Sequence, residues 1–409
     1  MTTTSATPSS NGKRIPFARA ASVGTALLAV LAPGAHADAI TDWNIKSGEI
    51  LMESKMGTPP AIRVMAIVQT AAYEAASRVD ARKASLDAAV AAAHRATLGK
   101  LVGGQQAAVD AAYQAAIQAI PEGPQRTAGI AVGERAAAKA LAAGASDGAA
   151  AAETYRPHAA PGAYVPTAIP AAVPWPQRKP WLMASAAQFR PAPPPALASD
   201  TWVRHYNEVK AYGGKADSQR SAEQTEVARF WEFSQPSIYH GLVRSVALQP
   251  GRDPVRNAWL FAVVAQAMDD AMIAVFDAKY HYNFWRPVTA IRNGDTDGND
   301  ATQRDPAWAS FIDTPLHPEY PSAHSILAAS VGAVLQAEAG QAALPPLSTA
   351  SPSAKGAVRR WSSIDAFVSE VAEARISGGM HYRFSTEVGA AMGRQIGALA
   401  AQRLLAARQ

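Results

Sequence analysis

The sequence predicts an all-α fold, on three observations. Apolar residues recur at helical spacing in long alanine-rich stretches between positions 38 and 152, as in 61–75. Alternation of β-branched and polar residues is almost absent, so no stretch predicts a sheet. The last helical stretch carries Gly389, Gly393 and Gly397 at intervals of four, which favours close contact with a neighbouring helix. Together these features predict a helical bundle.

The first 37 residues have the pattern of a secretory signal peptide. Three cations precede an apolar run at 23–31, and Ala35-His36-Ala37 is a small-x-small cleavage site before Asp38. We therefore expect a secreted or periplasmic protein. The chain has no cysteine, which excludes disulfides, thiolate metal sites and a cysteine nucleophile.

The charge balance is mild. The whole chain has a formal net charge of +5, and the leader holds three cations and no acids, so the remainder carries +2. That value is too small to predict a nucleic-acid or membrane partner. The most apolar later stretch, 258–276, is interrupted by Gln266, Asp269 and Asp270. We therefore expect no membrane span and a soluble protein.

Three regions follow the leader. Residues 38–155 form an N-terminal helical region, with breaks expected near Asp80, at 121–124 and at 144–148. Residues 156–199 are rich in proline but carry two tryptophans and a phenylalanine, which favours a segment that wraps the helical body over a disordered tether. Residues 200–409 form a C-terminal helical region.

Five helices are expected in the C-terminal region. Their approximate ranges are 200–212, 221–233, 255–276, 323–339 and 386–407. Ser221 and Gln224 offer a capping box for the second helix, and Gly340 ends the fourth. Asp269, Asp270 and Asp277 are expected to partner nearby basic groups.

The stretch His317-Pro-Glu-Tyr-Pro-Ser-Ala-His324 brings a hydroxyl and an imidazole to the start of a helix. Ser322 falls near the N-cap, where unpaired backbone amides can bind an oxyanion. The alternative role of Ser322 is helix capping alone. The two roles are compatible.

Two further clusters, 279–287 and 375–384, carry cations. Lys279, Arg286 and Arg375 together could neutralise an anion of charge near −3, and the planar arginine side chain suits oxyanion edges. Any one of them alone would be read as a solvated surface charge.

The three motifs occur in a defined order. Lys279-x6-Arg286-Pro, Pro-Ser322-x-His324 and Arg375-x5-His381 together resemble the signature of the vanadium-dependent haloperoxidases and the type 2 acid phosphatases. The sequence around Trp285 and Tyr320 resembles the haloperoxidases beyond the motif itself. The N-terminal half is similar to secreted bacterial members of the haloperoxidase family. The resemblance implies the helical-bundle fold of that superfamily.

The resemblance also implies roles for individual residues. His381 would ligate vanadium in bound vanadate, while Lys279, Arg286, Arg375, Ser322 and the Ala323 amide would hold the oxygens. His324 would be the acid-base group, and Lys279 would also polarise hydrogen peroxide. The implied reaction is oxidation of a halide to hypohalous acid, which attacks a small organic acceptor. The oligomeric state is left open, with a homodimer as one option.

Other readings remain. The same residues suit an acid phosphatase, with His381 as nucleophile and His324 protonating the leaving alcohol, or an exported oxyanion-binding protein without catalysis. A zinc site from four histidines lacks a ligand spacing that would support it; these are His281, His317, His324 and His381.

The chain departs from the family pattern at two positions. Ala323 stands in place of the usual glycine, and Ser385 in place of an aspartate four residues after His381. The aspartate would orient His381 and raise its basicity. Its absence favours a haloperoxidase over a phosphatase, which needs a strongly nucleophilic imidazole.

The resemblance places His317 and Trp285 beside the halide pocket. Histidine at position 317 is similar to the algal bromoperoxidases, whereas chloroperoxidases have phenylalanine. Iodide and bromide are therefore expected to be better substrates than chloride. The alternative is that His317 caps the turn at 315–318.

Overall fold

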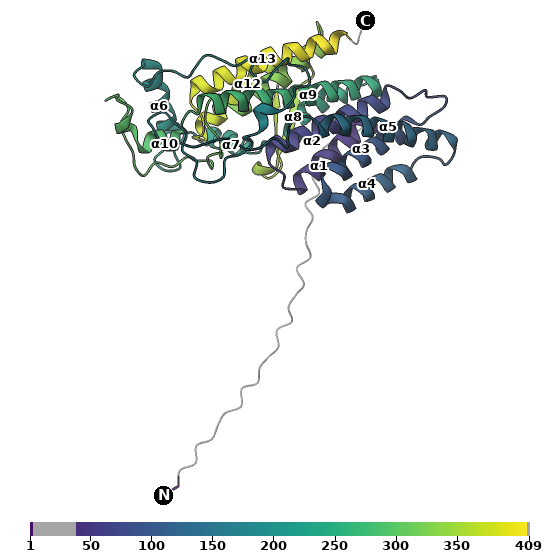
Figure 1. Cartoon of the computed structure of the whole chain (residues 1–409), viewed down its shortest axis with the longest axis horizontal. Coiled ribbons are helices and arrows are strands. Elements are labelled where there is room, and N and C mark those ends of the chain that lie inside the picture. Colours follow the sequence, from purple (N-terminus) through teal and green to yellow (C-terminus); the bar gives the residue numbers. More distant parts are fainter. Residues whose placement is uncertain (3–37, 407–409) are drawn as a thin grey trace. The chain divides into compact units, whose positions relative to one another are not determined.

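The computed structural model describes residues 1–2 and 38–406 of this chain. Residues 3–37 of the predicted signal peptide, cleavage site included, lie outside the described residues. Over the described part, α-helices account for most of the chain: α1 (Ala39–Glu53), α2 (Thr58–Ala76), α3 (Leu86–Leu101), α4 (Gln106–Gln118), α5 (Pro124–Ala145), α6 (Asp200–Tyr212), α7 (Ala222–Phe230), α8 (Pro236–Ala247), α9 (Pro254–Tyr282), α10 (Pro287–Arg292), α11 (Ala323–Ala339), α12 (Ile364–Ser377) and α13 (Arg383–Ala406). The predicted all-α class is confirmed (Figure 1).

Helix α9 is the central element. Asp253 caps its start and Pro254 occupies its first turn, where a missing amide proton has no cost. Asn283 ends it in the left-handed conformation, with φ of 48°. Every residue from Asn257 to Lys279 is buried, and α2, α11 and α13 pack against it. Although α9 is long and apolar enough to span a bilayer, its most apolar stretch is wholly enclosed by the protein.

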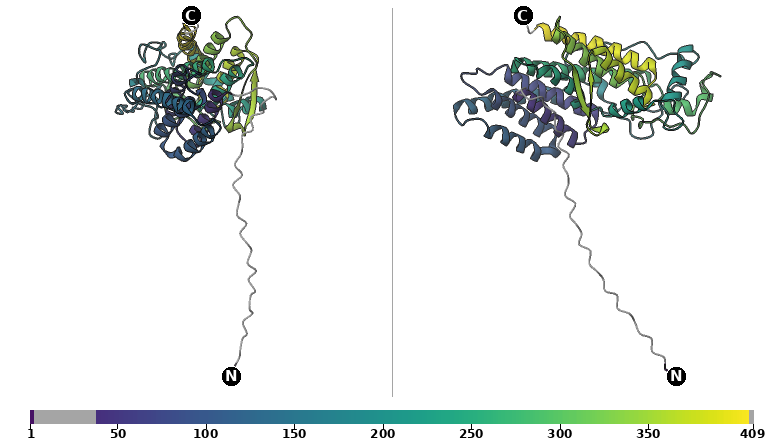
Figure 2. Two further views of the ribbon diagram at one scale, coloured as in Figure 1. Left: turned by 90° about the vertical axis from the view of Figure 1, so that its right-hand side faces the viewer. Right: turned by 180° about the vertical axis from the view of Figure 1, so that it is seen from behind.

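The first five helices gather together, away from α6 and α10 (Figure 2). Helix α2 packs on both α9 and α3, and α3 packs on α5, so α2 joins this group to the central helix. The predicted breaks near Asp80, at 121–124 and at 144–148 fall between or at the ends of helices. Alanine allows this close packing because its side chain adds little width.

Helices α11 and α13 lie in close contact. A Cβ atom at Gly393 would be 2.3 Å from the carbonyl oxygen of Ile326, and one at Gly397 would be 2.7 Å from that of Ser330. Only glycine allows this approach of the two backbones. The predicted contact of the glycine face with a neighbouring helix is confirmed, although α13 begins at Arg383, three residues earlier than expected.

The proline-rich segment is attached to α9 by buried polar contacts. Arg178 donates to both carboxylate oxygens of Asp269, at 2.6 and 2.8 Å, and Arg190 does the same to Asp277. Asp270 accepts from three consecutive backbone amides, beginning with Trp181 at 2.7 Å. The prediction of basic partners is thus wrong for Asp270, whose partners are amides.

A two-stranded hairpin departs from the expectation of no sheet. Strand β1 (Leu347–Ser351) pairs antiparallel with β2 (Ala357–Trp361) and packs on α8, where Gly241 leaves room for Thr349. Strands of five residues are too short for their alternation to stand out in the sequence. Helices α8 and α12 were also not anticipated, and α12 carries Arg375.

Candidate active site

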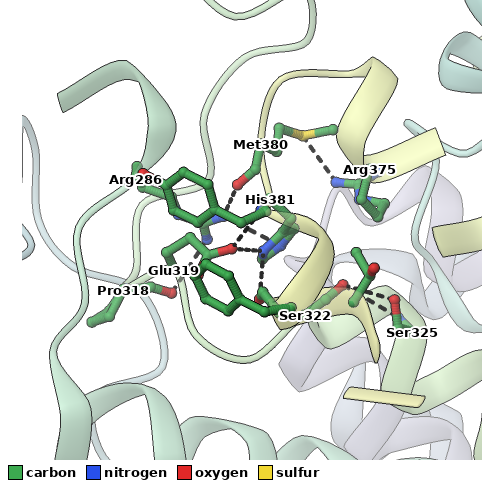
Figure 3. A network of polar contacts seen from close by, with 12 residues as sticks. Arg286, Pro318, Glu319, Ser322, Ser325, Arg375, Met380 and His381 are labelled. Carbon is green, nitrogen blue, oxygen red and sulfur yellow. Dashed lines mark hydrogen bonds and ion pairs between the residues drawn. The ribbon is translucent and has the colours of Figure 1, made fainter. Parts of the chain in front are cut away.

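The three sequence motifs meet at one end of α9 (Figure 3). Lys279 lies in the last turns of α9, and Arg286 directly precedes α10. Ser322 is the N-cap of α11. Arg375 lies in the last turn of α12, and His381 lies in the short connection between α12 and α13. All five are buried, so the predicted residues form one interior site rather than a scatter of surface charges.

Lys279 and Arg286 each donate to backbone carbonyls of the other motifs. Lys279 Nζ donates to the carbonyl oxygens of Pro318 and Glu319, at 2.9 and 2.7 Å. Arg286 donates through Nε to the His317 carbonyl at 2.9 Å and through Nη1 to the Met380 carbonyl at 2.8 Å. These contacts hold the second and third motifs against the first.

Arg375 has fewer strong partners. Its Nη1 donates to the Trp231 carbonyl at 2.7 Å, and its Nη2 lies 2.9 Å from the sulfur of Met380, a weak acceptor. Its buried Nε atom has no hydrogen-bond partner within the part of the chain that the structure describes. Arg375 therefore keeps donor capacity for a ligand.

Positive charge exceeds negative charge in this site. Burial lowers the pKa of Arg286 to about 10 and that of Arg375 to about 9. Burial, followed by the charge of Arg286, lowers the pKa of Lys279 well below its usual value. Glu319 is fully buried beside them, so these four groups carry a formal charge of +2. Buried charge of one sign is costly unless it is paired, and this arrangement is therefore suited to an anion.

His381 is held on both ring nitrogens. Its Nδ1 lies 2.7 Å from Glu319 Oε1, and its Nε2 lies 3.3 Å from Arg286 Nη1. Burial, followed by Arg286 and Lys279, lowers the pKa of His381 well below the usual value. Ser385, in the position of the family's aspartate, is 3.4 Å from Nδ1 through its Oγ.

Glu319 was missed as a site residue. The absence of an aspartate at 385 does not leave His381 without a carboxylate, because Glu319 supplies one from the turn before α11. Burial raises the pKa of Glu319 to about 7, while Arg286 and Lys279 oppose the rise. Its signal in the sequence was an acidic residue inside an otherwise apolar, proline-rich turn. Nothing in that pattern identifies which histidine it contacts.

His324 lies in the first turn of α11 with its Nε2 buried and unpartnered. Burial, then Arg375 and Lys279, lowers the pKa of His324 well below its usual value, although a hydrogen bond with the Trp231 backbone opposes this. Ser322 Oγ accepts from Ser325 N at 3.4 Å and Ser325 Oγ at 3.1 Å. Ser322 is therefore an N-cap, as predicted, and Ala323 is the buried first residue of the helix.

His317 contacts the cation cluster. Its Nδ1 lies 3.0 Å from Arg286 Nη2, and its ring packs edge-on against Phe276 with centroids 5.1 Å apart. Its backbone amide also donates to the Pro315 carbonyl, as the turn-capping alternative requires. Trp285 stacks on Trp202 in a separate aromatic cluster, so its predicted place in the halide pocket remains a prediction.

The zinc alternative finds no grouped ligands. Among residues 1–2 and 38–406, no three metal-ligating side chains of His, Cys, Asp or Glu gather in one place. His281 is exposed at the end of α9.

Comparison with known proteins identifies the C-terminal part. Residues 259–409 match the VCPO second helical-bundle domain. The matched residues include Lys279, Arg286, Ser322, Arg375 and His381, so the whole cation cluster lies within the stretch that is similar to this VCPO-type domain.

A vanadium chloroperoxidase from Curvularia inaequalis is 29% identical over 176 residues, which cover 36% of this chain and 28% of that protein. The matched stretch thus spans less than a third of this relative. The structure resembles that of the first bacterial vanadium-dependent iodoperoxidase, with a TM-score of 0.75 and 23% identity over 89% of this chain and 95% of the other. It also resembles a holo-type bacterial vanadium-dependent chloroperoxidase, with a TM-score of 0.70 and 18% identity over 86% and 93%. These similarities establish a shared fold that extends beyond the VCPO-type domain.

Proposed function

We propose that this protein is a vanadium-dependent haloperoxidase that uses hydrogen peroxide to oxidise halide to hypohalous acid. The observation that carries the proposal is the burial of three cationic side chains, Lys279, Arg286 and Arg375, around a single carboxylate, Glu319. The relatives named above are haloperoxidases of this kind. Hydrogen peroxide, a halide and a small organic acceptor are the proposed partners, and an exported location is proposed from the leader sequence.

The residues present fit vanadate. Among the described residues, the donor Arg375 Nε and the imidazole nitrogen His324 Nε2 have no partner, and together with the excess of cationic side chains they suit an oxyanion of high charge. Lys279, Arg286, Arg375, Ser322 and the Ala323 amide would hold its oxygens, and His381 Nε2 would ligate vanadium. When bound, vanadate supplies a Lewis acid that activates peroxide for two-electron oxidation of halide.

The chain's own contribution is charge and proton control. The overall reaction consumes one proton, since peroxide, halide and a proton give hypohalous acid and water. His324 is kept neutral by burial and by nearby cations. An anion in the site neutralises those cations, so His324 can then take up a proton and deliver it to the departing oxygen.

A secreted acid phosphatase is the second candidate, and Glu319 favours it. A carboxylate at 2.7 Å from His381 Nδ1 is the partner that a histidine nucleophile needs, so the serine at 385 no longer counts against phosphoryl transfer. The third candidate is an oxyanion-binding protein without catalysis, which the same cations would serve.

One experiment separates the three. Metal-free protein is assayed for bromide-dependent halogenation of an activated dione with and without orthovanadate, alongside aryl phosphate hydrolysis. Halogenation that requires vanadate is the result expected of a haloperoxidase. Phosphate release inhibited by vanadate would overturn that proposal in favour of the phosphatase, and tight vanadate binding with neither activity would favour the non-catalytic protein.

Halide preference depends on His317. Because its Nδ1 lies 3.0 Å from Arg286, the imidazole can hydrogen-bond within the anion site and keep it more polar than a phenyl ring would. We propose activity with iodide and bromide and little with chloride. The chloride-to-bromide rate ratio should rise in His317→Phe. A wild-type protein that oxidises chloride as fast as bromide would contradict this role.

A further inference from the structure

Glu319 connects all three motifs. Its carboxylate Oε1 is 2.7 Å from His381 Nδ1 and accepts from the Tyr382 amide at 3.1 Å. Its backbone carbonyl accepts from Lys279 at 2.7 Å, and its amide donates to the Phe284 carbonyl at 2.8 Å. Both its side chain and its backbone are therefore fixed before any ligand binds.

These contacts determine the tautomer of His381. Glu319 Oε1 already accepts from the Tyr382 amide, and an ionised carboxylate only accepts hydrogen bonds, so Nδ1 carries the proton that Glu319 receives when Glu319 is ionised. A guanidinium only donates, so Nε2 beside Arg286 must present its lone pair. Two independent partners thus require the same tautomer, with the Nε2 lone pair directed into the cation cluster.

The carboxylate beside His381 comes from the second motif and not from the third. The family pattern places an aspartate four residues after the histidine, where this chain has Ser385. Ser385 Oγ is still 3.4 Å from the same Nδ1 atom, so the side chains at positions 319 and 385 both face one ring nitrogen. One position has a carboxylate and the other a hydroxyl, and either could hold the acid.

We propose that Glu319, in the second motif, is the positioning residue of His381 and takes the place of the aspartate that is absent at position 385. Its carboxylate directs the Nε2 lone pair of His381 at the bound oxyanion. This rests on the proposed function in that His381 is taken to contact the oxyanion. Loss of such an outer carboxylate typically weakens binding at the metal 10- to 100-fold.

The test compares three variants as metal-free proteins. Glu319→Ala should raise the dissociation constant for orthovanadate by about 10- to 100-fold. The double variant Glu319→Ala/Ser385→Asp should recover most of the lost vanadate affinity, since it again has a carboxylate beside His381 Nδ1. Glu338→Ala is the matched control: it removes a buried carboxylate that lies in α11, where Arg252 and Arg256 hold it, and it should leave the vanadate affinity unchanged.

Nitrogen NMR of labelled histidine gives a readout independent of vanadate. Wild type and the double variant should show His381 protonated at Nδ1, and Glu319→Ala should show a mixture of tautomers. The His381 signal is assigned by its loss in His381→Gln. Circular dichroism and thermal unfolding verify that each variant is folded.

Two results would overturn the proposal. The first is vanadate affinity in Glu319→Ala within threefold of wild type. The second is a folded Glu319→Ala protein whose loss of vanadate affinity is not restored by Ser385→Asp. That result would mean that Glu319 acts by holding its turn in place and not by placing a carboxylate beside His381. Neither of these two results depends on halogenation. Wild-type protein that binds vanadate without halogenating bromide would therefore overturn the proposed function alone. The tautomer of His381 and the vanadate affinities would still decide whether Glu319 positions His381.

Discussion

Replacing Arg375 with alanine is the most direct test of the cation cluster. Arg286 donates to the carbonyls of His317 and Met380, so its loss would also loosen the fold. Arg375 has one carbonyl partner, one thioether partner and a buried Nε with none. Its removal should therefore change anion binding more than stability.

The magnitude follows from the hydrogen bonds that Arg375 can offer. A hydrogen bond to a charged group contributes about 1.5–3 kcal/mol, and solvent does not screen this one because Arg375 is 2% exposed. Losing one such bond should raise the dissociation constant for vanadate or phosphate by about 10- to 150-fold. Arg375→Lys keeps the charge without the planar fork, so its effect should be intermediate.

The assay is calorimetric titration of metal-free protein with orthovanadate and, separately, with phosphate. Arg95→Ala is the control, since it removes the same charge from α3, where Arg95 pairs with Asp110 on the surface. It should bind both anions as wild type does. Folded Arg375→Ala protein that binds both anions within threefold of wild type would refute a contact between Arg375 and the anion.

Three further predictions concern the ligand, the helix contact and the response to acid. His381→Ala should abolish halogenation and weaken vanadate binding while circular dichroism stays helical, and unchanged activity would exclude His381 as the ligand. Gly389→Ala should lower both thermal stability and vanadate affinity, because its Cβ would lie 2.6 Å from the Ser322 carbonyl. Gly397→Ala, whose Cβ would meet Ser330, should lower thermal stability alone. Equal loss of vanadate affinity in the two variants would contradict this difference. Burial lowers the pKa of His94 to about 4. Below about pH 6.5 the unfolded chain therefore takes up a proton at His94 that the folded protein excludes. The contribution of neutral His94 to folding stability is complete above that pH and is lost as the pH falls towards 4. Urea unfolding at pH 7.5 and 5 measures how much unfolding free energy each protein loses on acidification, and this loss should be about 2 kcal/mol smaller in His94→Gln than in wild type. Identical losses in the two proteins would refute this role of His94.

The sequence predicted elements whose signals are local. The end of α11 at Gly340, the capping box at Ser221 and the α6 range of 200–212 all match the structure, because caps and breaks depend on neighbouring residues. The motifs also located the three cations and both site histidines. Their proposed catalytic roles stay predictions, since the structure shows position and charge alone.

Features that depend on tertiary contacts could not be predicted. Asp270 was given a cationic partner because acidic residues usually pair with basic ones, yet it accepts from three amides of a segment about 90 residues earlier in the chain. Glu319 was not predicted as a site residue. Its contact with His381 joins residues 62 positions apart, and no periodicity carries that information.

The same helix contact that holds the bundle together also positions the site. Ser322 and His324 begin α11, and His381 lies directly before α13, so the separation of the acid-base group from the proposed ligand depends on how these helices meet. At this end the Ser322 amide donates to the Ser385 carbonyl at 3.1 Å, and Gly389 leaves no space for a side chain beside the Ser322 carbonyl. A contact made by backbone atoms is stiffer than one made by long side chains, which can adopt other rotamers. The glycines of α13 therefore contribute to the preorganisation of the proposed oxyanion site, and Gly389 does so through its contact with Ser322.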